Sequence, residues 1–559
     1  MSRGRLGRLH ALRGTFGDAA ARERSTLLAA LARADWHDPG ALAAWHDELL
    51  FMTAFPANLR EWRAAARGRG EILERVRALS AAGRAALADS GIAGTCTTTT
   101  FGYGAARWLA ARGECIAFEW AAPDDATRLD PLLRLALVPS ESDRFESGEI
   151  STTAWLDEAA ARTVHRARRA PGTAYWLLAH PPAAPEPVLR TLYDEAEPPL
   201  RWEIGDSRAS TTRAVRPGRP VIRSAFRPAP ADPVAHVQRP LAGIRRASPA
   251  EARRWHDLAC GALLARTREV FPIVHASLGE VHLAPLGLGV MLVLFGTAPS
   301  DRSALEANYG YLLAANGVPI GYGGVTTFGA QANTGINIFE AFRRSEAAFV
   351  FAQALRAFRT LFGVTRFVVN PFQFGAGNAE AIASGAYWFY DRLGFRPRDS
   401  VAAALADRER AAMQRDPTHR SSVRTLRALA RGDLVLTLAD ARGDGPTPES
   451  LLVAAGRMAT HALSDVPAGE REAWIDRHAR ALKRRLTGRT GRLTAAEARG
   501  ARHLVPVLVA LGPQLARWPR ADRAAVWSLV ARKGATQELA FARAAARLPR
   551  LWDLLAARA

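Results

Sequence analysis

The stretch "YGYLLAANGVPIGYGGVTTF", residues 309–328, decides how the middle of this chain folds. Two apolar runs rich in β-forming residues stand on either side of Asn316-Gly317. Asn-Gly is favoured in two-residue hairpin loops because both positions need a positive φ, which these two residues accept most easily. The pattern therefore predicts an antiparallel hairpin, and the neighbouring elements can be assigned outward from it.

A strand, a helix and a second strand are predicted downstream of the hairpin. The segment "TGINIFEAF" (334–342) alternates apolar and polar residues as a strand does. The next segment, "RRSEAAFVFAQALRAFRTLFG", places its large apolar residues on one helical face and closes with Gly363. The run "VTRFVV" (364–369) then has the β-branched composition of a strand.

The aromatic stretch "SGAYWFYDRLGFRP" (384–397) predicts a last helix that ends at Gly394. Its aromatic side chains are expected to pack the helix against the sheet, above all Trp388 and Phe389. Including an upstream helix that begins at Ser248, the order is helix, hairpin, strand, helix, strand, helix. Such an order is typical of a mixed α/β domain.

Two capping boxes mark helix starts elsewhere in the chain. Ser248 is followed three residues later by Glu251, and Thr494 is followed by Glu497. In this motif each side chain accepts a hydrogen bond from the other residue's backbone N–H. We expect a helix to begin at each box, and Gly512-Pro513 to end the second helix.

The length of 559 residues predicts three or four domains. A Pro- and Arg-rich stretch, residues 213–244, favours extended structure and is the predicted linker. It separates a mainly helical N-terminal domain (1–212) from a central domain (245–400), and a mainly helical C-terminal domain (401–559) follows. The predicted fold class is α/β, with a mixed sheet flanked by helices in the central region.

The charge of the chain is a weak guide to its partners. The formal net charge is +21 at pH 7, but Lys483 and Lys533 are the only lysines among the cations. Such arginine use, together with abundant alanine, is typical of a GC-rich genome, so nucleic acid is an alternative partner and not the favoured one. The densest basic run, residues 477–492, is interpreted as a solvated helix face in preference to a polyanion contact.

Cysteine use and hydropathy indicate a reducing, aqueous setting. Cys96, Cys115 and Cys260 are far apart and odd in number, which argues against a disulfide framework and a cysteine-based metal site. The basic N-terminus lacks the apolar core of a secretory signal, and the most apolar run (286–296) is too short to cross a bilayer. We expect a cytoplasmic protein with no membrane span and no metal.

The order of elements, the hairpin "AANGVPIGYGGV" (314–325) and the ending "YDRLGF" (390–395) resemble the GNAT N-acetyltransferase superfamily. The resemblance covers about 245–398. It implies a GNAT-like mixed sheet in which the strand before the central helix splays from its neighbour. The backbone of that strand, here 334–342, would hydrogen-bond the pantetheine arm of acetyl-CoA or another acyl-CoA.

The resemblance also implies that the donor's pyrophosphate binds the loop 343–348, on backbone N–H groups at the start of the next helix. Glu346 stands where the family has its first glycine. A carboxylate about 4 Å from a phosphate charge would cost roughly 1 kcal/mol in a water-like medium and roughly 4 kcal/mol at an effective dielectric of 20. Glu346 therefore either faces inward and opposes the donor, or turns outward to pair with Arg343 or Arg344, or the site serves a different donor. The donor-binding residues implied are Phe339, Ala341, Phe342, Arg343, Arg344, Ser345, Ala347 and Ala348.

The family's general acid is the tyrosine before Leu-Gly-Phe, and Tyr390 stands at that position. A phenol with its usual pKa of about 10 is protonated at neutral pH, as an acid must be. Core packing is the competing interpretation of Tyr390. For the base the sequence offers Glu306, Glu340 and His275; Glu340 is favoured because the pattern puts it on the splayed strand.

Three functions follow as expectations. The first is a GNAT-like N-acyltransferase that moves an acyl group from acyl-CoA to an unidentified amine on a small molecule or a protein. The second is a GNAT-like fold retained without catalysis, as a binding or scaffold module between two helical domains. The third is a transferase with a nucleic-acid-linked donor such as aminoacyl-tRNA, which would use the arginine excess.

Overall fold

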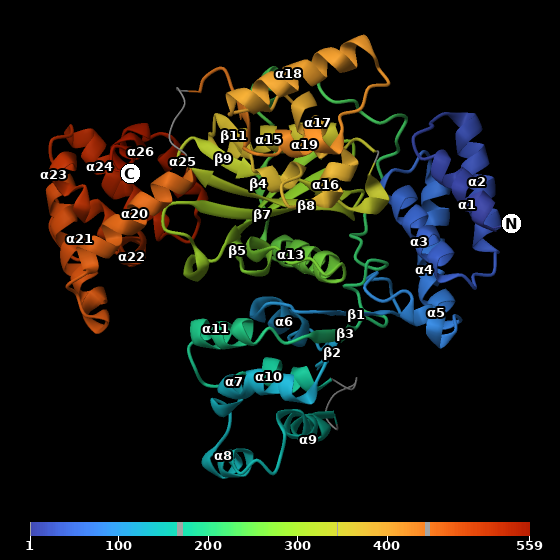
Figure 1. Cartoon of the computed structure of the whole chain (residues 1–559), viewed down its shortest axis with the longest axis horizontal. Coiled ribbons are helices and arrows are strands. Elements are labelled where there is room, and N and C mark those ends of the chain that lie inside the picture. Colours follow the sequence, from blue (N-terminus) through green and yellow to red (C-terminus); the bar gives the residue numbers. More distant parts are fainter. Residues whose placement is uncertain (1, 165–171, 344, 442–447, 559) are drawn as a thin grey trace.

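The structure is a computed structural model that describes residues 2–164, 172–343, 345–441 and 448–558. A large sheet with helices on both faces forms its middle, and three lobes surround that sheet (Figure 1). The N-terminal helices lie on one side, the C-terminal helices on the opposite side, and a small α/β lobe lies below in this view. The mixed α/β class predicted from the sequence is confirmed.

Ten strands form the central sheet across the described residues. Their order is β12-β13-β11-β9-β8-β7-β6-β5-β4, with β10 attached to β8. Neighbours are antiparallel, except that β9 and β11 are parallel. The bounds are β4 Arg245–Arg246, β5 Ala276–Gly287, β6 Val290–Thr297, β7 Ala307–Ala315, β8 Val318–Phe328, β9 Gln331–Thr334, β10 Asn337–Ile338, β11 Arg366–Val369, β12 Arg396–Pro397 and β13 Leu434–Thr437.

The predicted hairpin is formed by β7 and β8. Asn316 and Gly317 have φ angles of 47° and 80°, as the two-residue turn requires. The Asn316 amide group donates to the carbonyl of Ala54 at 2.9 Å, and its oxygen accepts from the N–H of Val221 at 2.8 Å. The turn therefore joins the sheet to the N-terminal lobe and to the proline-rich segment.

Alternate residues of the sheet face two different cores, as the pleat of a strand requires. Leu292, Leu294 and Leu313 face the core shared with α15 (Ala347–Phe362). Their neighbours face the core shared with α13 (Pro249–Leu264) and α14 (Phe271–Val274), namely Val293, Phe295 and Leu312. Helices α15 and α13 lie on opposite sides of the sheet (Figure 1). The capping box at the start of α13 and the left-handed Gly363 after α15 are confirmed.

The strand predicted over 334–342 is wrong in its second half. β9 ends at Thr334, β10 covers only Asn337–Ile338, and Glu340–Phe342 form a 3-10 turn, η3. The chain turns here because Phe342 is fully buried against aromatic rings of the N-terminal lobe. Beyond Asn333 the chain parts from β11 but stays beside β8, first through Thr334 and then through β10, so the strand separation lies earlier than the sequence pattern suggests.

The region after α15 completes the central sheet. The helix predicted before Gly394 is α17 (Ala386–Arg392), and a separate short helix, α16 (Ala379–Ser384), precedes it across the left-handed Gly385. They follow the 3-10 turn η4 (Pro371–Phe374). β13 pairs with β11 and β12, so the sheet continues past residue 400. Helices α18 (Ser400–Arg415) and α19 (Val423–Leu429) lie between β12 and β13 in the chain.

The N-terminal region consists of two units. The first is helical, with bounds α1 Ser2–Ala11, α2 Asp18–Ala32, α3 Pro39–Ala54, α4 Leu59–Arg77 and α5 Ala81–Ala85. The second surrounds an antiparallel sheet of order β1-β3-β2 that the sequence analysis did not predict. Its bounds are β1 Cys96–Thr99, α6 Tyr103–Ala110, β2 Cys115–Phe118, η1 Pro123–Leu129, α7 Asp130–Arg134, α8 Pro139–Glu146, α9 Thr152–Val164, α10 Thr173–Ala179, α11 Glu186–Ala196 and β3 Leu200–Glu203.

The proline-rich segment 213–244 contains one short helix, α12 (Pro233–Gln238), and otherwise runs without regular structure. The C-terminal lobe is helical. Its bounds are α20 Pro448–Leu463, η5 Ala468–Glu470, α21 Arg471–Thr487, α22 Ala495–Ala510, α23 Gly512–Leu515, α24 Arg520–Lys533, α25 Leu539–Ala546 and α26 Pro549–Ala556. The second capping box starts α22, and this helix ends before Gly512, as predicted.

Candidate functional site

Glu346 lies at the start of α15, where the family resemblance implies the donor's pyrophosphate. Only 2% of the residue is exposed. Its carboxylate forms an ion pair with Arg223, which comes from the proline-rich segment. The backbone N–H of Arg227 donates to the same carboxylate at 3.2 Å. The start of α15 thus holds an anion and a cation that both belong to the chain.

The outward orientation considered for Glu346 is not the one observed. Arg343 pairs on the surface with Glu380, and Arg344 lies outside the described residues. The Glu346 side chain does not cap α15 either, because it accepts no hydrogen bond from the N–H groups of the helix's first turn. The distant Arg223 is its ionic partner, which a local reading of the sequence could not show.

Arg223 is held in place by two other parts of the molecule. Its backbone N–H donates to the carbonyl of Pro56 at 2.8 Å, and its Nη1 donates to the carbonyl of Leu288 at 2.6 Å. Its guanidinium also lies 5.6 Å from the centre of the Phe55 ring. The proline-rich segment therefore fixes the arginine between the N-terminal lobe and the central sheet.

The N-terminal lobe covers the turn before α15. Phe342 is fully buried and lies 6.4 Å from Phe51 and 6.3 Å from Phe55, measured between ring centres. The carbonyl of Ala341 accepts a hydrogen bond of 2.8 Å from the guanidinium of Arg13. The family resemblance assigns the backbone of Ala341 to binding of acyl-CoA. Its carbonyl is instead bonded to the N-terminal lobe.

The other residues that the resemblance assigns to acyl-CoA binding also form contacts within the chain. The N–H of Phe339 donates to the carbonyl of Ile320 at 3.0 Å, and the guanidinium of Arg266 lies 4.2 Å from its ring centre. The hydroxyl of Ser345 donates to the carbonyl of Phe342 at 2.7 Å. Both alanines of the first helical turn are half-buried, namely Ala347 and Ala348.

Tyr390 is 2% exposed and lies where β9 and β11 part. The backbone N–H of Ile336 donates to its hydroxyl, and burial raises the pKa of Tyr390 well above its usual value. The hydroxyl of Tyr311 donates to the carbonyl of the neighbouring Gly335. Two protonated phenols therefore hold the bend at 335–336. Aromatic rings surround Tyr390, namely Phe351, Phe374, Phe389 and Phe395.

The three candidate bases lie in different places. Glu340 is exposed and stands in the turn η3, and not on the strand that was predicted for it. His275 packs against Phe271 with ring centres 4.3 Å apart, and burial lowers the pKa of this histidine. Burial raises the pKa of Glu306, and the neighbouring Glu449 raises it further. The structure does not gather these groups into one constellation with Tyr390.

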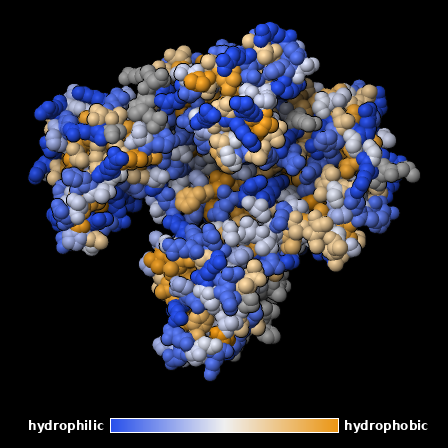
Figure 2. Space-filling model, viewed as in Figure 1, coloured by the Kyte–Doolittle hydropathy of each residue, from blue (hydrophilic) through white to orange (hydrophobic). Residues whose placement is uncertain are grey.

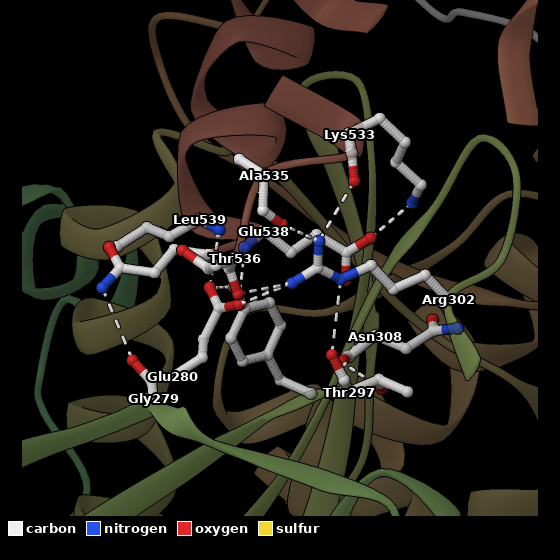
Figure 3. Close-up of polar contacts among 12 residues, drawn as sticks. Gly279, Glu280, Thr297, Arg302, Asn308, Lys533, Ala535, Thr536, Glu538 and Leu539 are labelled. Carbon is white, nitrogen blue, oxygen red and sulfur yellow. Dashed lines mark hydrogen bonds and ion pairs between the residues drawn. The ribbon is translucent and has the colours of Figure 1, made fainter. Parts of the chain in front are cut away.

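A buried ionic network, which the sequence analysis missed, joins the sheet to the C-terminal lobe (Figure 3). Glu280 accepts hydrogen bonds from the hydroxyl of Tyr309 at 2.5 Å and from the N–H groups of Glu538 and Leu539 at 2.5 and 2.7 Å. Arg302 donates to three carbonyls of the loop between α24 and α25, at 3.0, 2.5 and 2.9 Å, namely those of Lys533, Ala535 and Thr536.

The network contains two acids and two cations in full burial. Lys533 and Glu538 form an ion pair, and the side chains of Glu280 and Arg302 meet at 3.2 Å. Burial lowers the pKa of Lys533 and raises that of Glu538. Because each charge has a partner of opposite charge, and three carbonyls and two N–H groups of the loop are bonded to Arg302 and Glu280, the network acts as a clamp between domains. The rarity of lysine in this chain was the one sequence signal that pointed to Lys533.

The described residues contain no cluster of three or more metal-ligating side chains, and no described helix is long and apolar enough to cross a bilayer. Figure 2 shows hydrophilic residues over much of each lobe, with apolar residues scattered among them. The chain matches no model of a protein family, no curated protein and no solved structure.

Proposed function

We propose that the chain is a non-catalytic binding scaffold built on a GNAT-type central domain. The buried ion pair between Glu346 and Arg223 carries this proposal. A donor pyrophosphate needs free N–H groups and a positive potential at the start of α15. Here a buried carboxylate stands beside that position, and its buried partner cation, Arg223, is already neutralised. A phosphate could enter only by separating a buried pair, which is strongly unfavourable.

Two more groups that acyl-CoA would need are already bonded within the chain. Arg13 of the N-terminal lobe donates a hydrogen bond to the carbonyl of Ala341, and the hydroxyl of Tyr390 is bonded to the N–H of Ile336. One apolar core also runs from the N-terminal helices through a face of the sheet to the C-terminal helices. The central domain thus holds the other lobes in fixed positions, which is what a scaffold requires.

Thermal unfolding with CoA and with acetyl-CoA tests the proposal. A ligand at 100 times its dissociation constant adds about 2.7 kcal/mol of stability, which the unfolding midpoint would reveal. We expect neither ligand to stabilise the parent chain. Glu346→Gly should instead respond to CoA, because Arg223 then faces the start of α15 with no counter-ion.

Glu380→Gly is the matched control, because it also removes a carboxylate near α15, but an exposed one. It should respond to CoA no more than the parent. Stabilisation of the parent by acetyl-CoA would overturn the scaffold proposal. So would a Glu346→Gly chain that folds and ignores CoA, since the carboxylate would then not be what excludes the donor.

An N-acyltransferase is the second candidate. The observation that favours it is the parallel pair β9 and β11, connected through α15, with the hydroxyl of Tyr390 at the point where they part. In that reaction an amine nitrogen bonds to the thioester carbon, the carbon–sulfur bond breaks, and Tyr390 protonates the departing thiolate. The amine's proton passes to a base.

Release of free thiol from acetyl-CoA, measured with a panel of amines, separates the two candidates. Transfer should be undetectable if the chain is a scaffold. If transfer occurs, Tyr390→Phe should lower turnover and leave donor affinity unchanged. Equal turnover in that variant would remove Tyr390 from the mechanism.

A further inference from the structure

A groove on the C-terminal lobe is lined by four exposed arginines. It has a volume of about 780 Å³ and lies between α21, the loop that follows it and the first turn of α22. Asp476 is the one carboxylate in its lining, among the residues that the structure describes. The arginines are Arg477, Arg480, Arg484 and Arg492.

Three of the arginines follow one face of α21. Arg477, Arg480 and Arg484 are spaced three and four residues apart, so their side chains lie in a row about 10 Å long. The opposite face of the helix is buried through Ile475, Ala479, Leu482 and Leu486. This much is also expected of any amphipathic helix whose charged face meets only water.

The fourth arginine comes from outside α21, which shows that the groove is more than the water-exposed face of one helix. Arg492 belongs to the loop after α21, where Gly488 and Gly491 adopt positive φ angles of 73° and 117°. The amino group of Lys483 donates to the carbonyl of Arg492 at 3.2 Å and to Glu497 of α22 at 2.9 Å. The loop is thus fixed so that its arginine joins the row from the helix.

The chemistry of the lining selects a phosphate-rich partner. Guanidinium groups bind phosphate through two parallel hydrogen bonds, and Asp476 offsets one of the four charges, 3.5 Å from Arg480. A row of arginines about 10 Å long is long enough to contact more than one consecutive phosphate of one strand. The described lining contains no aromatic side chain on which unpaired bases could stack.

We propose that this groove binds the phosphate backbone of double-stranded nucleic acid, without reading its bases. The site lies in the C-terminal lobe and is separate from the start of α15. The proposal therefore goes beyond the scaffold function and does not depend on it, and CoA binding has no bearing on its test.

Fluorescence anisotropy of a short labelled DNA duplex, measured over a range of salt concentrations, tests the proposal on the full chain. Each phosphate contact contributes about 0.9 to the slope of log affinity against log salt. Arg477→Ala/Arg480→Ala/Arg484→Ala should weaken binding and reduce that slope by roughly 2 to 3. The single variant Arg492→Ala should reduce it by roughly 1, which keeps the test open if the triple variant does not fold.

A charge-matched control separates the groove from the general positive charge of the chain. Arg408→Ala/Arg415→Ala/Arg424→Ala removes three exposed arginines from α18 and α19, and should leave the slope as in the parent. The proposal is overturned if the parent does not bind the duplex at low salt. It is also overturned if the salt slope falls as much in the control variant as in the groove variant. Tighter binding of a single strand than of the duplex would also overturn it.

Discussion

Arg223 and Glu346 form a buried ion pair that joins the proline-rich segment to the start of α15. Each side chain is about 1% exposed. The arginine is also bonded to Pro56 and Leu288, so the pair ties the N-terminal lobe, the segment 213–244 and the sheet together at one point. The same contact places a buried carboxylate at the start of α15, which is the observation that the scaffold proposal rests on.

Glu346→Gln should destabilise the chain by about 3–5 kcal/mol, because it leaves the Arg223 charge buried without a counter-ion. The double variant Arg223→Met/Glu346→Gln should recover most of that loss. Urea unfolding measures both effects. Glu380→Gln, which breaks an exposed ion pair, should cost about 1 kcal/mol or less. A Glu346→Gln chain as stable as this control would show that the buried pair contributes little.

Glu280→Ala should loosen the C-terminal lobe. It removes the acceptor of four hydrogen bonds, one of them from Arg302, and leaves Arg302 buried beside the loop 533–539, a change that costs about 3–5 kcal/mol. Amide hydrogen exchange should rise in that loop before it rises in β7. Asp522→Ala, which breaks the exposed pair with Arg550, is the control and should leave exchange unchanged. Uniform exchange across the whole chain would contradict a local clamp.

Gly317→Ala should destabilise the hairpin more than Gly363→Ala. Both glycines have positive φ angles, 80° and 75°, which cost an alanine about 1–2 kcal/mol. A methyl group at Gly317 would also overlap the carbonyl oxygen of Arg216, whereas the space around Gly363 is open. The difference in unfolding free energy between the two variants measures that overlap. Equal losses would mean that the segment at Arg216 moves aside freely.

The stability of the fold should decrease as pH falls from about 6.5 to 4. Burial lowers the pKa of three histidines to about 4, namely His282, His256 and His503. In this window the unfolded chain binds protons that the folded chain does not, so the loss appears on acidification. His282→Gln should reduce the pH dependence by about 1.4 kcal/mol per pH unit. Unchanged dependence of the unfolding midpoint would show that His282 titrates normally.

The elements that the sequence predicted well depend on neighbours in the chain. The Asn316-Gly317 turn, both capping boxes and the left-handed Gly363 follow from local backbone and hydrogen-bonding rules, and all are observed. Tyr390 lies in the helix predicted before Gly394 and is buried, as its core-packing interpretation expects. Its function is still a proposal.

The features that could not be predicted depend on contacts between distant segments. Nothing near Glu346 indicates that Arg223 is its partner, and nothing near Glu340 shows that burial of Phe342 would turn the strand into a 3-10 turn. β13 pairs with β11 although four α-helices and β12 lie between these two strands in the chain. Hydrophobic periodicity describes which face of an element is buried, but not which segment covers it.

The burial of Phe342 by Phe51 and Phe55 also has a consequence for synthesis of the chain on the ribosome. The N-terminal helices leave the ribosome nearly 300 residues before Phe342 does, since 342 − 51 = 291. At about 5–20 residues per second, their aromatic face is uncovered for roughly 15–60 seconds. During that interval it is a natural target for chaperones that hold nascent chains.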